Sequence, residues 1–160
     1  MLSVYQAETS DYNFIYPQVI RAAKHKHFLL DPAYKEERDY LKRNLKSVLS
    51  TGKMENGLCG QPLIFQHEGT NIGFALISEI KPGHGGNEIH LFLVHHQYQQ
   101  QGFGAAMLDE INQRWQSVDL YARCFPASQT MQNMLQRRGF VYTHTNSEGA
   151  SVLLRQKIDL

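Results

Sequence analysis

The chain has 160 residues, a length that fits one domain over 1–160, and its 16 Lys and Arg nearly balance its 15 Asp and Glu. This balance argues against a broad electrostatic grip on nucleic acid, and no apolar run approaches the ~20 residues that span a bilayer. Because residues 1–18 also lack the pattern of a signal peptide, we expect a cytoplasmic protein whose Cys59 and Cys124 are free thiols.

The first predicted elements are a strand over 2–7 and a helix over 11–26. A second helix is predicted from Asp31-Pro32, a helix-start signal, to about Leu49. The remaining elements follow in order: strands over 63–67, 72–80 and 88–95, a helix from the glycine-rich turn to about Trp115, a strand over 118–125, a helix over 128–138, and strands over 140–144 and 150–158. This order, β-α-α-β-β-β-α-β-α-β-β, predicts a mixed α/β sandwich.

The predicted strand over 88–95 has the clearest pattern. Its centre, Leu91-Phe92-Leu93-Val94, is apolar on both faces, which favours a central place in the sheet. Glu88 and His90 alternate along it and are predicted to share a face. His95 and His96, at its end, are predicted to point to opposite faces and to chelate poorly, and we expect no metal site.

A turn with the sequence Gln99-Gln100-Gln101-Gly102-Phe103-Gly104-Ala105 joins this strand to the next helix. A helix start presents free N–H groups and a positive dipole end, and its two glycines leave room for a phosphate. A dinucleotide-binding turn would need a third glycine where Met107 stands, and no Gly-Lys-Ser or Gly-Lys-Thr of a P-loop occurs. The turn alone leaves two interpretations open: an anion-binding corner, or a helix start whose small residues serve packing.

Several motifs in the order of one family accompany this turn. Gln99, Gly102 and Gly104 match a signature of Gln or Arg, two residues, Gly, one residue, then Gly or Ala. With Gly73-Phe74-Ala75-Leu76 and Arg137-Arg138-Gly139-Phe140, the chain from about 63 to 140 resembles the GNAT acetyltransferase superfamily. The resemblance implies an α/β (α+β) fold: a mixed, mostly antiparallel sheet of about seven strands, flanked by four helices and splayed between strands 4 and 5. Dimers are common among proteins that resemble this one, so a homodimer is one expected assembly.

The resemblance also implies acetyl-coenzyme A as the cofactor. In this family the N–H groups of the turn bind the pyrophosphate, the pantetheine lies along the central strand in the splayed gap, and a residue at the position of Ser128 often touches the cofactor. A strand N–H aimed at the thioester oxygen would favour the transition state. The implied cofactor-binding residues are Phe92, Leu93, Val94, Gln99, Gln100, Gln101, Gly102, Phe103, Gly104, Ala105 and Ser128.

The implied reaction is direct attack of a primary amine on the thioester, and such an amine must first lose a proton because it titrates near ~10. Glu88 lies fourteen positions before Gly102, the spacing of the catalytic glutamate in the histone-acetylating branch, and is the predicted base. His90 is predicted to relay protons. The plainer alternatives stay open: a carboxylate that only orders its surroundings, and a hydrogen-bonded strand histidine.

One departure from the family pattern concerns the proton that the leaving thiolate would take up. The family often supplies a Tyr where this chain has Leu135, which cannot donate a proton. The candidate substitutes are Tyr121, Cys124 and Tyr142, although a buried, inert thiol is the plainer interpretation of Cys124. Leu135 therefore favours the alternative function, a non-catalytic acyl-CoA-binding sensor or assembly module. A third hypothesis is a phosphate-ligand protein that shares only the turn.

The acceptor site is implied to lie along the first two helices and their connection. The residues there suit a partly apolar or cationic amine, or else pack the core: Tyr12, Phe14, Tyr16, His25, His27, Phe28, Leu29 and Tyr34. The sequence does not name the amine, so small metabolites, polyamines, antibiotics and the amines of peptides and protein N-termini all remain acceptors to consider.

Overall fold

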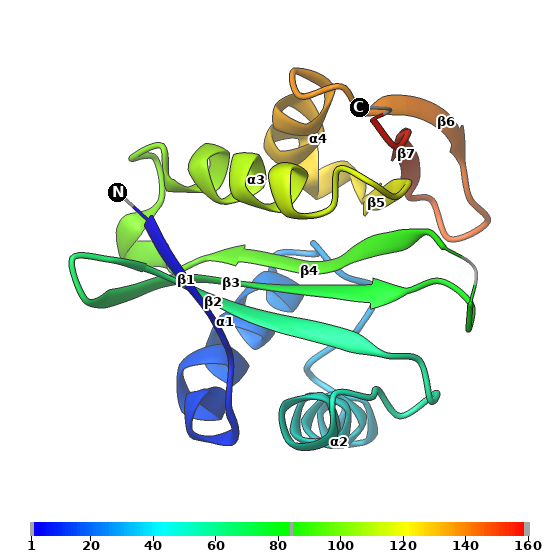
Figure 1. Ribbon diagram of the computed structural model, residues 1–160. Helices are drawn as coiled ribbons and strands as arrows, with labels where there is room; N and C mark the ends of the chain where they lie inside the picture. The colour runs from blue at the N-terminus through cyan, green and yellow to red at the C-terminus, as the bar shows by residue number, and fades with distance from the viewer. Residues whose placement is uncertain (1, 84, 159–160) are drawn as a thin grey trace.

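The computed structural model, which describes residues 2–83 and 85–158, has the strands and helices in the predicted order (Figure 1). The strands are β1 (Leu2–Gln6), β2 (Gly60–His67), β3 (Thr70–Glu79), β4 (Asn87–Val94), β5 (Leu120–Cys124), β6 (Val141–Thr145) and β7 (Ser151–Arg155). The helices are α1 (Tyr12–Lys24), α2 (Lys35–Thr51), α3 (Phe103–Arg114) and α4 (Gln129–Gln136), with single 3-10 turns η1 (Thr9–Asp11), η2 (His96–Tyr98) and η3 (Pro126–Ser128). None of the described helices has the length and apolarity that crossing a bilayer requires.

The strands form one open sheet in the order β1-β2-β3-β4-β5-β7-β6. Its neighbouring strands are antiparallel except β4 and β5, which run parallel. Only Asn87–Ile89 of β4 pairs with β5, through Leu120–Ala122, and beyond these residues the two strands separate. The predicted fold class, a mixed sheet splayed between its fourth and fifth strands, is therefore confirmed.

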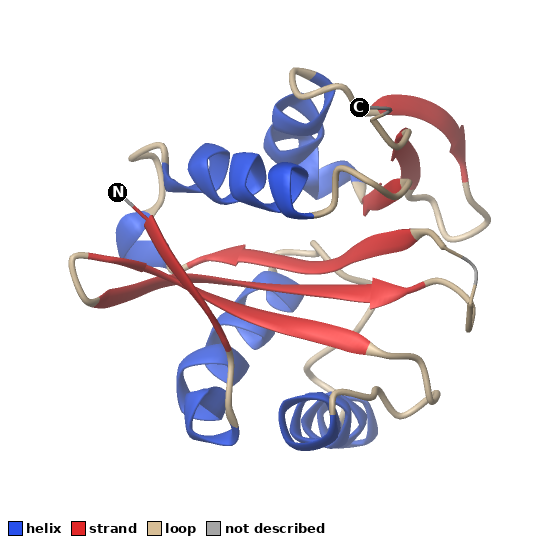
Figure 2. Cartoon of the chain, in the orientation of Figure 1, coloured by secondary structure: helices blue, strands red, loops and turns tan. Residues whose placement is uncertain are grey.

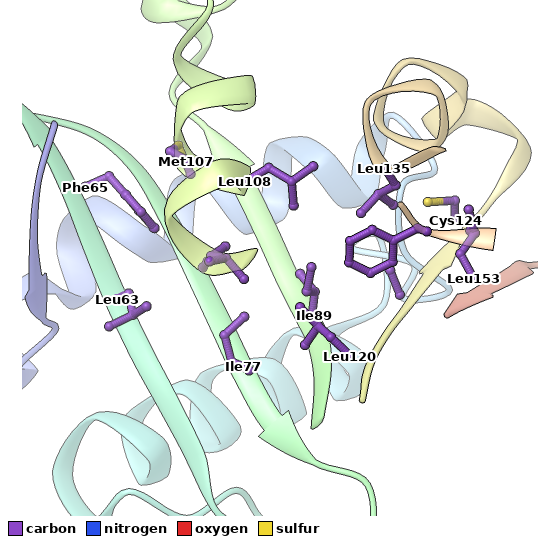
Figure 3. Packing of buried hydrophobic residues seen from close by; sticks show 14 of the residues in the cluster. Leu63, Phe65, Ile77, Ile89, Met107, Leu108, Leu120, Cys124, Leu135 and Leu153 are labelled. Atoms are coloured by element: carbon purple, nitrogen blue, oxygen red, sulfur yellow. The ribbon is translucent and has the colours of Figure 1, made fainter. Parts of the chain in front are cut away.

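Each face of the sheet carries its own apolar core, with α1 and α2 on one face and α3 and α4 on the other (Figure 2). Ile64 and Phe65 show how β2 serves both, because successive strand side chains point to opposite faces. Both are fully buried, Ile64 in the α1/α2 core and Phe65 in the α3/α4 core. Figure 3 shows the α3/α4 core, in which Leu108 lies between sheet residues and Leu135.

A β-bulge interrupts the alternation of β4 at His90. In the pairing with β3, Ile77 faces Ile89 and Leu76 faces Leu91, so His90 is left without a partner. Consequently Ile89 packs in the α3/α4 core while Leu91 packs in the α1/α2 core, although both are odd-numbered. Bulges of this kind re-aim a side chain and are frequent next to active sites.

The start of α2 differs from the prediction. The helix begins at Lys35, whereas Asp31-Pro32 forms a turn in which the Asp31 carboxylate accepts the N–H of Ala33 at 2.9 Å. The reason is local: Asp can hydrogen-bond the backbone two residues ahead as readily as it caps a helix. The segment between α1 and α2 is therefore a connection of turns and bends, and its residues His27 and Phe28 reach the gap between β4 and β5.

Candidate active site in the gap between β4 and β5

A cavity of about 800 Å³ opens where β4 and β5 separate. Four segments line it: α1 with the residues after it, the part of β4 that is not paired with β5, the turn that precedes α3, and the chain from β5 into α4. This size falls within the range of ~300–1,000 Å³ typical of ligand pockets. The separation of two sheet strands, rather than a surface loop, thus creates the site.

The turn before α3 is shaped as an anion cradle. Gln100 and Gly102 both take positive φ, 63° and 83°, and Gly102 is the N-cap of α3. Alternating backbone conformations at a helix start make successive N–H groups converge on one point, where an anion binds. A Cβ built on Gly102 would meet nothing within 4 Å, so the space in front of the turn is open. The turn therefore fits a diphosphate.

The predicted turn residues divide into two groups. Gln99, Gln100, Gly102, Gly104 and Ala105 line the cavity, and the Gln99 amide donates a hydrogen bond to the carbonyl of Val94 at 3.1 Å.

The other two predicted turn residues, Gln101 and Phe103, do not line the cavity. The Gln101 amide donates to the carbonyl of Gln97 at 3.3 Å, and Phe103 packs against His67, with ring centroids 5.0 Å apart. Their side chains therefore hold the turn in place, and only their backbone groups could face a ligand.

The gap itself has mostly apolar walls. Phe92, Leu93 and Val94 of β4 face it, as do Met131 and Met134 of α4. Because the pairing with β5 stops at Ile89, this length of β4 has no described strand partner on that side. It therefore offers backbone groups to a chain-like ligand that carries amides.

Ser128, the remaining predicted cofactor residue, also lines the cavity and is buried. Its Oγ lies 2.6 Å from Nδ1 of His27, which belongs to the segment after α1. Burial, with a smaller effect of His25, lowers the pKa of His27, so this imidazole favours its neutral form. The bond joins the α1 layer to the start of α4 across one end of the gap.

The two predicted catalytic residues come together with a third that the sequence did not indicate. Oε1 of Glu88 accepts a hydrogen bond from Nη2 of Arg123 at 2.7 Å and lies 3.3 Å from Nδ1 of His90. Burial acts to raise the pKa of Glu88, but the hydrogen bond with His90 and the charge of Arg123 outweigh it and hold the pKa below its ordinary value. Glu88 is therefore a carboxylate at neutral pH.

Among these three residues, His90 and Arg123 line the cavity and Glu88 does not. The Glu88 side chain is only 17% exposed and lies behind the other two. Arg123 carries no local sequence signal, because the register of β5 against β4 brings it to Glu88, 35 positions away in the chain.

The candidate proton donors for a leaving thiolate lie in different places. Leu135 is fully buried in the α3/α4 core beside Cys124 (Figure 3), and only Cys124 of the three substitutes lines the cavity. Burial raises the pKa of the Cys124 thiol to about 11, so it keeps its proton at neutral pH. The Tyr142 side chain is 47% exposed on β6 and shares a hydrogen bond with Thr145.

The prediction that His95 and His96 point to opposite faces is wrong. The rings of His95 and His96 stack, with centroids 4.4 Å apart, because β4 ends at Val94 and strand alternation ends with it. His95 instead caps η2, where its Nδ1 accepts the N–H of Gln97. Over residues 2–83 and 85–158, no three His, Cys, Asp or Glu side chains gather as a metal site would require.

The sequence supplies the decisive comparison. Residues 5–140 match the acetyltransferase (GNAT) family. This chain belongs to the GNAT acetyltransferase family. The match runs from the end of β1 to a few residues past α4 and so includes the turn and both walls of the gap. Coenzyme A as the cofactor of this GNAT chain is thereby confirmed, in agreement with the fit of the turn to a diphosphate.

Solved structures share the fold at low sequence identity. An aminoglycoside acetyltransferase in complex with coenzyme A has a TM-score of 0.71 and 13% identity, covering 98% of this chain and 95% of that one. Spermidine N-acetyltransferase from Vibrio cholerae, with coenzyme A and spermine, has a TM-score of 0.71 and 14% identity, covering 96% and 92%. N-acetylglutamate synthase from Neisseria gonorrhoeae, with coenzyme A and N-acetyl-glutamate, has a TM-score of 0.69 and 18% identity, covering 99% of this chain and 36% of that one. No curated protein matches this sequence significantly.

Proposed function

We propose that this GNAT protein is an N-acetyltransferase that moves an acetyl group from acetyl-coenzyme A to a primary amine. One observation carries the proposal: a single cavity joins a turn shaped for a diphosphate to a histidine that is paired with a carboxylate. A binding protein needs the turn, whereas a titratable histidine–carboxylate pair beside it serves proton transfer.

The cofactor would be held mainly by the main chain. Backbone N–H groups from Gln100 to Ala105 would bind the diphosphate, and Phe92 to Val94 would flank the pantetheine, with Ser128 opposite. When bound, acetyl-coenzyme A supplies a thioester carbonyl to an attacking amine, so that a C–N bond replaces the C–S bond and the amine's lost proton balances the thiolate's gain. Met131 and Met134 would give this channel an apolar wall.

His90 is the group that would take the proton from the amine. It lines the cavity, and the charged Glu88 can only accept hydrogen bonds, so the proton of a neutral His90 ring lies on Nδ1. Nε2 then carries the free lone pair, and no described residue hydrogen-bonds to it. A neutral imidazole oriented by a carboxylate is the arrangement of a general base.

Glu88 would act as a positioning residue rather than as the base in contact with the amine. Its carboxylate fixes the orientation of His90 and stabilises the ring when it becomes charged. Arg123 completes the group by holding Glu88 in its ionised form. The thiolate would take its proton from solvent, because Cys124 holds its proton too tightly at a pKa of about 11.

A non-catalytic acyl-CoA sensor is the second candidate function, and the burial of Leu135 favours it. Leucine has no hydroxyl to offer a leaving thiolate, and this side chain is fully buried in the α3/α4 core. Such a module would keep the cofactor site and use no proton-transfer group. Glu88, His90 and Arg123 would then serve only to hold β4 to β5.

Two measurements on the intact protein separate these functions. Thermal unfolding with acetyl-coenzyme A, coenzyme A or ADP reports binding at the turn, and thiol release across an amine panel reports transfer. An acetyltransferase shows a rise in melting temperature with coenzyme A and amine-dependent thiol release. Stabilisation without release on any amine would make the protein a sensor, and no stabilisation would overturn the cofactor site itself.

A further inference from the structure

One face of α1 lines the same cavity and is polar and basic. Gln18, Arg21, Ala22 and His25 are spaced three and four positions apart and share this face. They extend over about 10 Å of the helix axis at 1.5 Å per residue. The sequence contains no Asp or Glu from Tyr12 to Leu30, so the charge of this segment is positive throughout.

The charge of the whole lining has one sign. Its titratable groups, from every element packed around the cavity, are basic or neutral: Arg21, His25, His27, His90, Cys124 and Arg123. Among the described residues that line the cavity there is no carboxylate, and Glu88 behind them is occupied by Arg123 and His90. A polycationic amine would lose its hydration in this cavity and gain no ion pair, so its binding is strongly disfavoured.

Arg21 is the cation in this lining that is available to a ligand. Arg123 donates to Glu88, whereas the Arg21 side chain forms no ion pair or hydrogen bond with any described residue. A guanidinium presents a planar fork of donors that matches a carboxylate in two hydrogen bonds. A basic residue in the last turn of a helix also offsets the helix dipole, and Lys24 does so too, but Lys24 does not line this cavity.

We propose that the acceptor is a small amine that carries a carboxylate, an amino acid in the simplest case, and that Arg21 binds this carboxylate. The inference rests on the acetyl transfer proposed above, because it names the substrate class of the same site. This acceptor class differs from the partly apolar or cationic amine that the aromatic residues of the first two helices and their connection predict. Amine and carboxylate would then lie along the cavity between His90 and α1.

The test measures binding, so that it does not depend on turnover. The protein saturated with coenzyme A is titrated by calorimetry with the twenty common amino acids, their C-terminal amides, and spermidine. We expect at least one amino acid to bind about tenfold or more tightly than its own amide, as a charge-assisted hydrogen-bond pair supplies. Arg21→Gln should bring the ratio of acid to amide affinity close to one and leave coenzyme A affinity within about twofold.

Lys24→Gln is the matched control, because it removes the same charge from the same turn of α1 outside this cavity and should preserve the ratio. The proposal is overturned if no amino acid binds, or if amides or spermidine bind more tightly than amino acids. It is also overturned if Arg21→Gln lowers the affinity for coenzyme A and leaves the ratio of acid to amide affinity unchanged. The last outcome would assign Arg21 to the cofactor phosphates. Thiol release on the same panel tests acetyl transfer separately, since selective binding without release would overturn the enzyme and retain the carboxylate site.

Discussion

Two walls of one cavity offer a ligand different kinds of contact. The turn from Gln99 to Ala105 offers backbone N–H groups at the start of α3, and its conformation depends on positive φ at Gln100 and Gly102. The α1 wall offers side chains, among which Arg21 carries the charge. Main-chain recognition tolerates sequence change as long as the backbone angles are kept, whereas side-chain recognition changes with a single substitution. The proposed cofactor wall can therefore remain constant while the proposed acceptor wall varies.

The largest effect is expected from a change to the backbone of the turn. Gly102→Val places a β-branched residue at φ 83°, with its side chain in the open space in front of the turn. Coenzyme A affinity should fall by at least about 100-fold, equivalent to ~2.7 kcal/mol, as measured by calorimetry. Gly57→Val is the control, because Gly57 has φ 84° and equally open surroundings away from the cavity. If both variants bind coenzyme A alike, the turn does not hold the cofactor.

The proton-transfer group between the two walls should affect turnover without affecting coenzyme A binding. Glu88→Gln removes the charge that orients His90, so kcat at neutral pH should fall by about 10- to 100-fold, while coenzyme A affinity stays within about twofold. Glu79→Gln removes a carboxylate at the end of β3, outside the cavity, and should leave kcat unchanged. Steady-state kinetics with a reactive amine measures both, and an unaltered kcat in Glu88→Gln would remove Glu88 from the mechanism.

The same carboxylate should give the fold an acid-sensitive contribution. Its pKa is lower in the folded protein than the ordinary 4.5, so folding favours the charged form. This stabilisation is complete above pH 4.5 and is lost as the pH falls below it through the folded value. Urea unfolding should show wild type more stable than Glu88→Gln by ~1 kcal/mol at pH 6, with the gap closing toward pH 3. A gap that stays constant with pH would show that the ion pair with Arg123 does not stabilise the fold.

The smallest effect is expected at Cys124, which lines the gap between the two walls. Because burial raises the pKa of its thiol to about 11, it neither attacks the thioester nor delivers a proton readily. Cys124→Ala should change kcat by less than about twofold and destabilise the protein by ~1 kcal/mol through lost packing. A tenfold loss of kcat, with coenzyme A affinity retained, would instead identify Cys124 as the proton donor to the departing sulfur.

The sequence by itself determined the local parts of the site. The order of strands and helices, the apolar β4 and the turn into α3 depend on neighbours within a few residues, so pattern and backbone preference predicted them. The helix-start signal at Asp31 failed at this level, because the same side chain also favours a turn. Strand alternation predicted that Glu88 and His90 share a face of β4. Their side chains lie within 3.3 Å of each other, although a bulge at His90 interrupts that alternation.

Only the tertiary structure decided how the local parts meet. Arg123 reaches Glu88 through the register of two parallel strands, and Ser128 reaches His27 across 101 positions, neither of which leaves a trace in the local sequence. The basic character of the cavity is of the same kind, because Arg21 contributes to it only once α1 packs beneath β4. Electrostatic environment is a sum over groups close in space, so a chain that is nearly neutral as a whole can enclose a site of one sign.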